Sequence, residues 1–238
     1  MYFDPIYWLV IGIGLVLSLW AQFRVKSSFA TYSRVPSRSG MTGADVARRI
    51  LDANRITGVT IEPIRGQMTD HYDPRTRTLR LSEPVYGSHS IAAAGVAAHE
   101  VGHAIQHADG YAPLKFRSAW VPVANLGGGF SMFVIMGALA LGGVATSTGR
   151  SLATLGILMF ATTTVFTLVT LPVEFDASRR ALKTLEAGGL MPREELTGAR
   201  RVLSAAALTY LAAFVSSLLT LLYWMFRLGV VGGGRNDR

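Results

Sequence analysis

The chain has 238 residues and contains no cysteine. Disulfide bonds and thiolate metal ligands are therefore excluded, so any metal site in this protein must use histidine and carboxylate side chains. Charged residues are also scarce, at 16% of the chain, whereas soluble domains contain about 25%. Half of the residues are apolar. This composition favours a membrane protein over a soluble one.

The formal net charge of +8 is the one feature that would suggest a nucleic-acid partner. The basic residues, however, bracket apolar runs instead of forming one continuous patch. We therefore expect the lipid bilayer to be a partner of this chain, and we expect no nucleic acid.

Four apolar runs are long enough to cross about 30 Å of hydrocarbon. They lie at about residues 5–23, 119–145, 152–172 and 203–226. A cleaved signal peptide would have a basic start and a small-residue cleavage site, whereas the first run has neither and is followed by Arg24. We expect it to be an uncleaved span. A short link joins the second and third runs, which predicts a membrane hairpin.

Basic residues near the ends of the spans predict the orientation of the chain. Most of them lie in the segments 24–118 and 173–202. The opposite side has Arg150, Arg227, Arg235 and Arg238. We therefore expect residues 1–238 to form a single membrane-embedded domain in a bacterial plasma membrane, with both large segments cytoplasmic and both termini outside.

The run from His99 to His103 reads H-E-x-x-H. On a helix, residues i and i+4 lie on the same face, so both imidazoles can bind one metal ion. Glu100 is rotated by about 100° from His99 and therefore flanks the metal, where it can act on a metal-bound water.

The surrounding stretch, residues 88–107, is rich in alanine and predicts a helix. Ser88 or Ser90 can cap its start, and the pair Asp109-Gly110 can end it. The motif could also lie on a surface helix by chance, since three fixed positions recur in about one window of 8,000. Because the motif follows an apolar stretch, we expect it to be buried, and buried ionisable groups need partners such as a metal ion.

A third ligand is needed, because a catalytic zinc usually has three protein ligands and one open position for water. Glu174 follows the third apolar run, where a carboxylate is costly unless it is paired or ligated. Between His99 and Glu174 the chain crosses the membrane twice, so it returns to the side it left. Glu174 is therefore the expected third ligand, and Asp176 is a candidate to orient a histidine. The alternative is that both carboxylates are charges at a helix N-terminus.

These residues resemble the neutral membrane zinc metallopeptidase family, also called YugP-like. The resemblance covers the first span and residues 69–74, 79–82, 97–106 and 172–178. It implies a membrane-embedded zinc endopeptidase with one Zn²⁺ and a cytoplasmic active site. The expected fold is mainly α: a four-helix transmembrane protein with a cytoplasmic zincin-like α+β part that carries a small β-hairpin or sheet.

The chain is also distantly similar to the HtpX-type and prenyl-protein proteases, which take a third ligand from a glutamate on a later helix. Those enzymes commonly place an aspartate four residues after that glutamate. Here this position is Ser178, and the nearest aspartate is Asp176. Gln106 stands three residues after His103, where metzincins have a glycine, so the chain is not a metzincin.

The segment before the motif predicts a small α+β part. Residues 40–56 read as an amphipathic helix with Thr42 as its cap. Residues 59–62 and 78–81 alternate like strands, and the turn at 73–76 suits a hairpin.

Zinc peptidases commonly bind their substrate as an added strand on a sheet edge, and we expect this hairpin to supply that edge. His71 and Tyr72 are candidates to stabilise the developing oxyanion. A structural hairpin with a satisfied surface histidine explains them at least as well. His107 lies one turn beyond the motif, and we do not include it among the ligands.

The predicted function is peptide-bond hydrolysis by a membrane-bound zinc endopeptidase acting on peptides or membrane proteins. His99, His103 and Glu174 hold zinc. Glu100 acts as general base on the zinc-activated water and passes the proton to the leaving amine. The alternative is a non-catalytic membrane protein with a structural zinc, which would need a fourth protein ligand such as His107 or His71.

Overall fold

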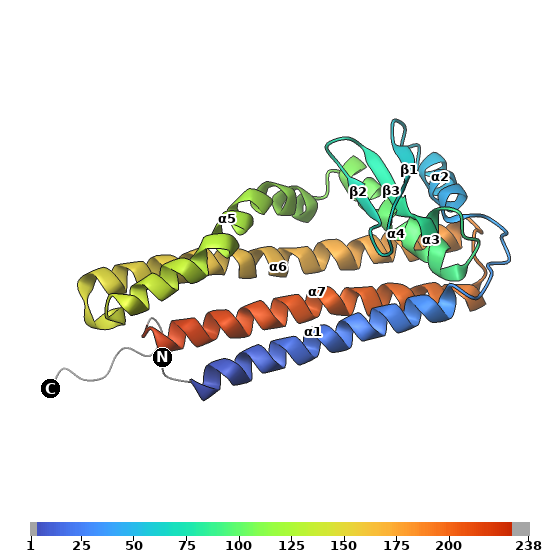
Figure 1. Cartoon of the computed structure of the whole chain (residues 1–238). Coiled ribbons are helices and arrows are strands. Elements are labelled where there is room, and N and C mark those ends of the chain that lie inside the picture. Colours follow the sequence, from blue (N-terminus) through green and yellow to red (C-terminus); the bar gives the residue numbers. More distant parts are fainter. Residues whose placement is uncertain (1–3, 230–238) are drawn as a thin grey trace. The chain divides into compact units, whose positions relative to one another are not determined.

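The computed structural model describes residues 4–229 (Figure 1). Over these residues the protein is mainly helical, with one three-stranded sheet. The elements are α1 (Pro5–Tyr32), α2 (Gly43–Ala53), β1 (Thr60–Ile64), β2 (His71–Asp73), β3 (Thr78–Ser82), α3 (Glu83–Tyr86), α4 (Ile91–Ala108), α5 (Ala112–Ala140), η1 (Gly143–Ala145), α6 (Ser147–Ala187) and α7 (Arg193–Arg227). Arg235 and Arg238, which the topology prediction used, lie outside the described residues.

The chain divides into two compact units. The helical unit comprises the described parts of 1–19, 116–170 and 210–238, and the site unit comprises 20–115 and 171–209. The long helices α1, α5, α6 and α7 contribute residues to both units.

The helical unit contains most of each apolar run. By length and composition, α1, α5, α6 and α7 are each able to cross a membrane. Large apolar side chains on them face outward, and Phe133 is 75% exposed. Such a surface is unfavourable in water, at about 25 cal/mol per Å² of apolar area, and suits contact with lipid.

Helix α6 continues without a break past Pro172, which lies inside it. Glu174 and Asp176 are therefore in the interior of a 41-residue helix. The alternative that they are charges at a helix N-terminus is wrong. Helix α5 ends at Ala140, so the last part of the expected second span, 119–145, is a turn followed by η1.

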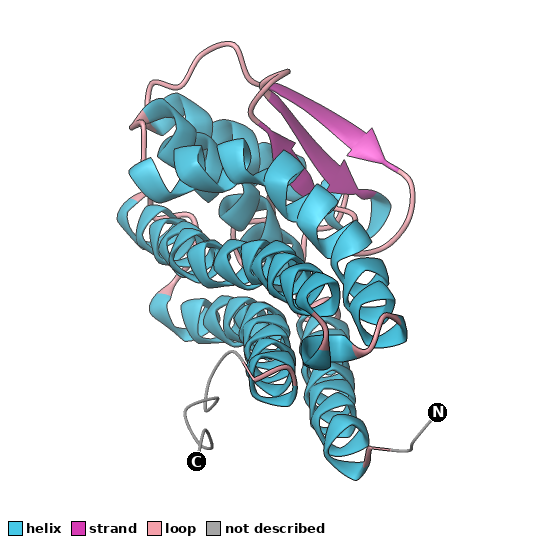
Figure 2. Ribbon diagram, turned by 90° about the vertical axis from the view of Figure 1, so that its left-hand side faces the viewer, coloured by secondary structure: helices cyan, strands magenta, loops and turns pink. Residues whose placement is uncertain are grey.

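The site unit contains the sheet, drawn in magenta in Figure 2. Its strand order is β1-β3-β2. The predicted hairpin is present: β2 and β3 are antiparallel, with Tyr72 opposite Leu79. Strand β1 pairs parallel to β3 on its other side. Leu79 and Leu81 of β3 are fully buried in the core of the unit.

Helix α4 carries the H-E-x-x-H motif through the core of the site unit. Of the two predicted caps, Ser90 is the one that accepts a hydrogen bond from the backbone N–H of Ala93. The helix ends at Ala108, and Gly110 follows with a φ of +66°, a left-handed conformation that suits glycine. The predicted helix and its end are thus confirmed.

Gly102 determines how closely α4 and α6 pack in this unit. A Cβ atom at this position would lie 2.5 Å from the carbonyl oxygen of Ala177. The two helices are therefore in direct backbone contact, which only a residue without a side chain allows.

Candidate metal centre

The structure brings His99, His103 and Glu174 together within the site unit. Each of the three offers one ligand atom, and these atoms all lie within 4.8 Å of one another. Oε2 of Glu174 is 3.3 Å from Nε2 of His99 and 3.7 Å from Nε2 of His103. The helix α4 supplies the two imidazoles one turn apart, and α6 supplies the carboxylate across the contact at Gly102.

The carboxylate of Glu174 is strongly stabilised in its ionised form, although the side chain is only 2% exposed. Burial alone would raise its pKa, but the contacts with His103 and His99 outweigh burial and hold the pKa far below its usual range. Burial would likewise lower the pKa of His103, but Glu174 and Glu100 raise it above its ordinary value. The buried carboxylate and the two imidazoles therefore create a negative potential between them, which attracts and stabilises a cation.

Glu100 is buried next to this cluster, at 8% exposure. Burial raises its pKa, and the nearby His99 and His103 offset part of that increase. A carboxylate whose pKa is shifted toward neutrality accepts and releases protons more effectively near pH 7 than an exposed one.

Asp176 does not touch a histidine, contrary to the simplest form of the prediction. Its Oδ2 accepts hydrogen bonds from Nε2 of Gln106 at 2.9 Å and from Nε of Arg180 at 2.6 Å. On its other ring nitrogen, Nδ1, His99 contacts the hydroxyl of Ser178 at 3.1 Å. Ser178 stands where the similar proteases have an aspartate, and it still makes a polar contact with His99.

Gln106 is the residue that sequence reasoning missed. It was used only to exclude a metzincin, yet its Oε1 lies 3.0 Å from Nδ1 of His103. The available signal was a glutamine three residues after a ligand in an otherwise apolar helix, where a buried amide needs partners.

The remaining histidines stand outside the cluster. His71 is exposed and its Nδ1 contacts the carbonyl oxygen of Thr69. The hydroxyl of Tyr72 is 2.9 Å from Nδ1 of His107. Within residues 4–229 the cluster therefore has three donors, and neither His71 nor His107 joins it as a fourth.

Comparison with known proteins identifies the family. Residues 7–229 match the family model described as "Putative neutral zinc metallopeptidase". The chain belongs to this family. A curated relative, "Putative membrane protease YugP" of Bacillus subtilis (strain 168), is 49% identical over 209 residues, which is 88% of this chain and 90% of the relative. No solved structure matches.

The neutral zinc metallopeptidase family implies a zinc ion, and the cluster fits one. Nitrogen and carboxylate oxygen are donors that zinc prefers when cysteine is absent. Bonds of about 2.0–2.2 Å in a tetrahedral site place two ligand atoms about 3.4 Å apart. The separations of 3.3 Å and 3.7 Å from Glu174 to the two histidines are close to this value.

Proposed function

We propose that this chain is a membrane-embedded zinc endopeptidase whose active centre is formed by His99, His103, Glu174 and Glu100. The observation that carries the proposal is the buried cluster of two imidazoles and one carboxylate, with a second buried carboxylate next to it. Three protein donors leave one coordination position for water or substrate, as catalytic zinc sites do and structural ones do not.

When bound, zinc would supply a Lewis acid that lowers the pKa of a coordinated water from about 16 to about 7 and polarises the scissile carbonyl. Glu100 would accept the proton of the attacking water and deliver it to the leaving amine. Its burial supports this role, because a buried carboxylate holds a proton more readily than an exposed one.

Strand β2 is the edge on which we propose that substrate binds. It is the last strand in the order β1-β3-β2 and it packs against α4, the helix of the motif. An extended peptide could pair with its free side through backbone hydrogen bonds, which hold any sequence in place.

For the oxyanion we propose Tyr72 in preference to His71. The phenol of Tyr72 is oriented by His107, one turn after His103 on the same face of α4. The side chain of His71 is exposed and is engaged by the carbonyl of Thr69.

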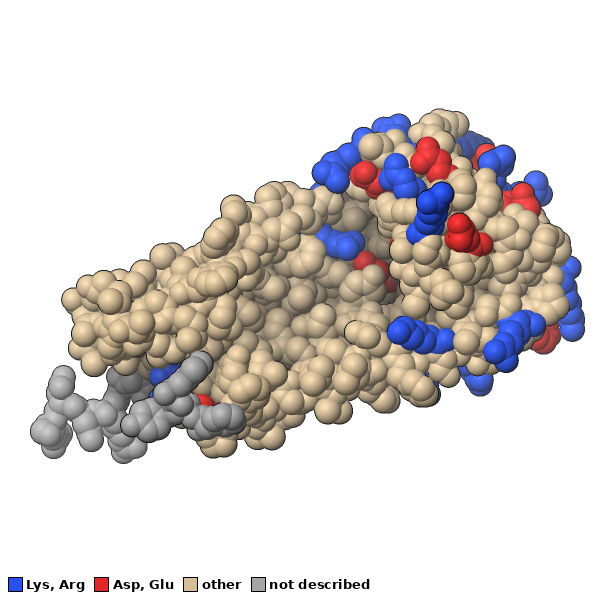
Figure 3. All heavy atoms as spheres, viewed as in Figure 1, with Lys and Arg blue, Asp and Glu red and all other residues tan. Residues whose placement is uncertain are grey.

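We propose that the four long helices cross the membrane and that the site unit is cytoplasmic. Lys, Arg, Asp and Glu side chains gather over the sheet and the helices beside it, whereas long stretches of the apolar helices show almost none (Figure 3). The excess of Lys and Arg in segments 24–118 and 173–202 supports the cytoplasmic side. Substrates would then be membrane proteins or peptides at the membrane surface.

The substitution Glu100→Gln tests the mechanism. The purified variant should retain one zinc per chain by elemental analysis and lose at least about 100-fold of its hydrolysis rate on an unfolded protein substrate. The matched control is Glu194→Gln, which changes an exposed glutamate of the same unit and should behave as wild type. Hydrolysis at the wild-type rate by metal-loaded Glu100→Gln would exclude Glu100 as the base.

A further inference from the structure

Gln106 makes hydrogen bonds through both the nitrogen and the oxygen of its side-chain amide, and the residue is completely buried. Its Nε2 donates to the carbonyl oxygen of Val173 at 2.8 Å and to Oδ2 of Asp176 at 2.9 Å. Its Oε1 lies 3.0 Å from Nδ1 of His103. All of these groups belong to α4 and α6, the two helices that supply the metal-binding cluster.

These partners fix the orientation of the amide. Both N–H bonds of Gln106 point at groups that can only accept, a carbonyl and a carboxylate. Rotating the amide by 180° would place Oε1 against two acceptors, so the observed orientation is the only satisfied one. Oε1 is therefore the atom that faces His103, and it can only accept.

The hydrogen on His103 follows from this orientation. Because Oε1 of Gln106 can only accept, Nδ1 of His103 must carry the hydrogen. Nε2 then has the free lone pair, and Nε2 is the atom that faces Glu174 at 3.7 Å. This is the tautomer that a histidine needs to bind a metal through Nε2.

We propose that Gln106 is a positioning residue that sets the tautomer and ring orientation of His103 for metal binding; this inference rests on the proposed function. Gln106 does not contact the lone pairs that would bind the metal, and it does not contact substrate. It acts only through His103. No such constraint acts on His99, because the hydroxyl of Ser178 can rotate and either donate or accept.

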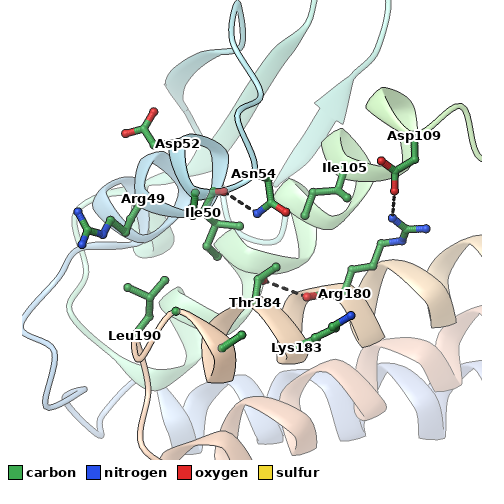
Figure 4. Close-up of a pocket in the computed structure, with 13 residues that line it drawn as sticks. Arg49, Ile50, Asp52, Asn54, Ile105, Asp109, Arg180, Lys183, Thr184 and Leu190 are labelled. Carbon is green, nitrogen blue, oxygen red and sulfur yellow. Dashed lines mark hydrogen bonds and ion pairs between the residues drawn. The ribbon is translucent and has the colours of Figure 1, made fainter.

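Arg180 contacts Asp176, the carboxylate that accepts a hydrogen bond from Gln106. Its guanidinium bonds to Asp176 and to Asp109, so the carboxylate that accepts from Gln106 is also neutralised. In Figure 4, Arg180 reaches toward Asp109 along the wall of a cavity of about 720 Å³. Hydrogen bonds thus connect the buried His103, through Gln106, Asp176 and Arg180, to the exposed carboxylate of Asp109.

Two substitutions separate positioning from a general structural role. Gln106→Met keeps the length of the side chain and removes the acceptor for His103. Gln106→Glu keeps an acceptor for His103 but places a buried carboxylate against Asp176 and the carbonyl of Val173, which should destabilise the fold. Zinc affinity, by chelator competition, and thermal stability of the metal-free protein are measured for both, with the exposed Gln67→Met as matched control.

Zinc affinity and thermal stability should rank the two Gln106 variants in opposite orders. Gln106→Met should lose about 10–100-fold in zinc affinity, while Gln106→Glu should keep more of the affinity and lose more thermal stability. In the cobalt-substituted protein, the exchangeable Nδ1–H resonance of one ligating histidine should broaden or disappear in Gln106→Met and persist in Gln106→Glu and in Gln67→Met.

Several outcomes would overturn the inference. Zinc affinity that simply follows stability, and is weaker in Gln106→Glu than in Gln106→Met, would show a structural role. Wild-type affinity and an unchanged N–H resonance in Gln106→Met would also exclude positioning. A wild-type protein that binds no zinc would instead contradict the proposed function, so the two failures are distinguishable.

Discussion

The helical unit and the site unit differ in where their ionisable side chains lie. In the described part of the helical unit, Asp4, Arg117, Arg150 and Arg227 lie near helix ends. The site unit instead buries Glu100, His103, Glu174 and Glu195. Glu195 accepts hydrogen bonds from the hydroxyl of Ser37 and the backbone N–H of Arg38, and Glu174 contacts His99 and His103.

The hydroxyl groups do not follow the same division between the units. In the helical unit several return to their own helix, as when Ser216 donates to the carbonyl of Ala212 and Thr220 donates to that of Ser216. In the site unit, Ser82 bonds to Asp70 and Ser178 to His99, far away in sequence. Hydroxyl groups of the helical unit also link separate helices, as when Thr164 donates to the carbonyl of Ser217 and Thr162 donates to that of Val123. The two units therefore differ in their buried charges and not in how they use hydroxyl groups.

The largest effect that separates the units is expected from Glu174→Gln. A neutral amide cannot replace a carboxylate ligand, so zinc affinity should fall by at least about 100-fold and hydrolysis should be lost. The control in the helical unit is Thr164→Val, which removes a buried hydroxyl that contacts the carbonyl of Ser217. Zinc content after dialysis measures both. An equal loss of zinc in Thr164→Val would show that zinc binding does not distinguish the site unit from the helical unit.

A second, smaller effect is expected from Tyr72→Phe. If the phenol stabilises the oxyanion, kcat should fall by about 100-fold while zinc content and KM stay near wild type. Tyr223→Phe in the helical unit also removes a hydroxyl, one that donates to Asp4, and should leave kcat unchanged. Steady-state kinetics on a peptide substrate compares the two. Unchanged kcat in Tyr72→Phe would leave that hydroxyl with only the role of holding His107.

The smallest effect is expected from Gly102→Ala. The added Cβ would meet the carbonyl of Ala177 at 2.5 Å, so α4 and α6 must separate, at a cost of about 1–3 kcal/mol. Gly129→Ala in the helical unit adds a Cβ that has no atom within 4 Å. Thermal unfolding and zinc titration should show a loss in the first variant and none in the second. Similar behaviour of both would mean that the contact between α4 and α6 is not tight.

Much of the site unit could be predicted from local sequence. The spacing of His99 and His103 places both imidazoles on one helix face, and the cap at Ser90 and the turn before β3 follow from short-range preferences. The proximity of Glu174 followed from the two intervening apolar runs. The family resemblance was confirmed by the match over residues 7–229.

Other features depend on contacts that no local pattern reveals. Strand β1 pairs parallel to β3, and alternation of side chains does not specify a partner or a direction. The third apolar run ends at residue 172, but Pro172 removes only one backbone donor and α6 continues through it, so the helix extends beyond the apolar run. A buried glutamine in α4 could be noticed from local sequence, but its partner Asp176 lies 70 residues later, so the orientation of its amide is visible only once α4 and α6 are packed.

Gly102 sets the spacing between the imidazoles of α4 and the carboxylate of α6. Ordinary contact begins at about 3.4 Å, so a methyl group here would shift α4 against α6 by several tenths of an ångström or more. Zinc sites tolerate departures of only about 0.2 Å in bond length. A methyl group at position 102 would therefore move His99 and His103 away from Glu174 by more than a zinc site tolerates.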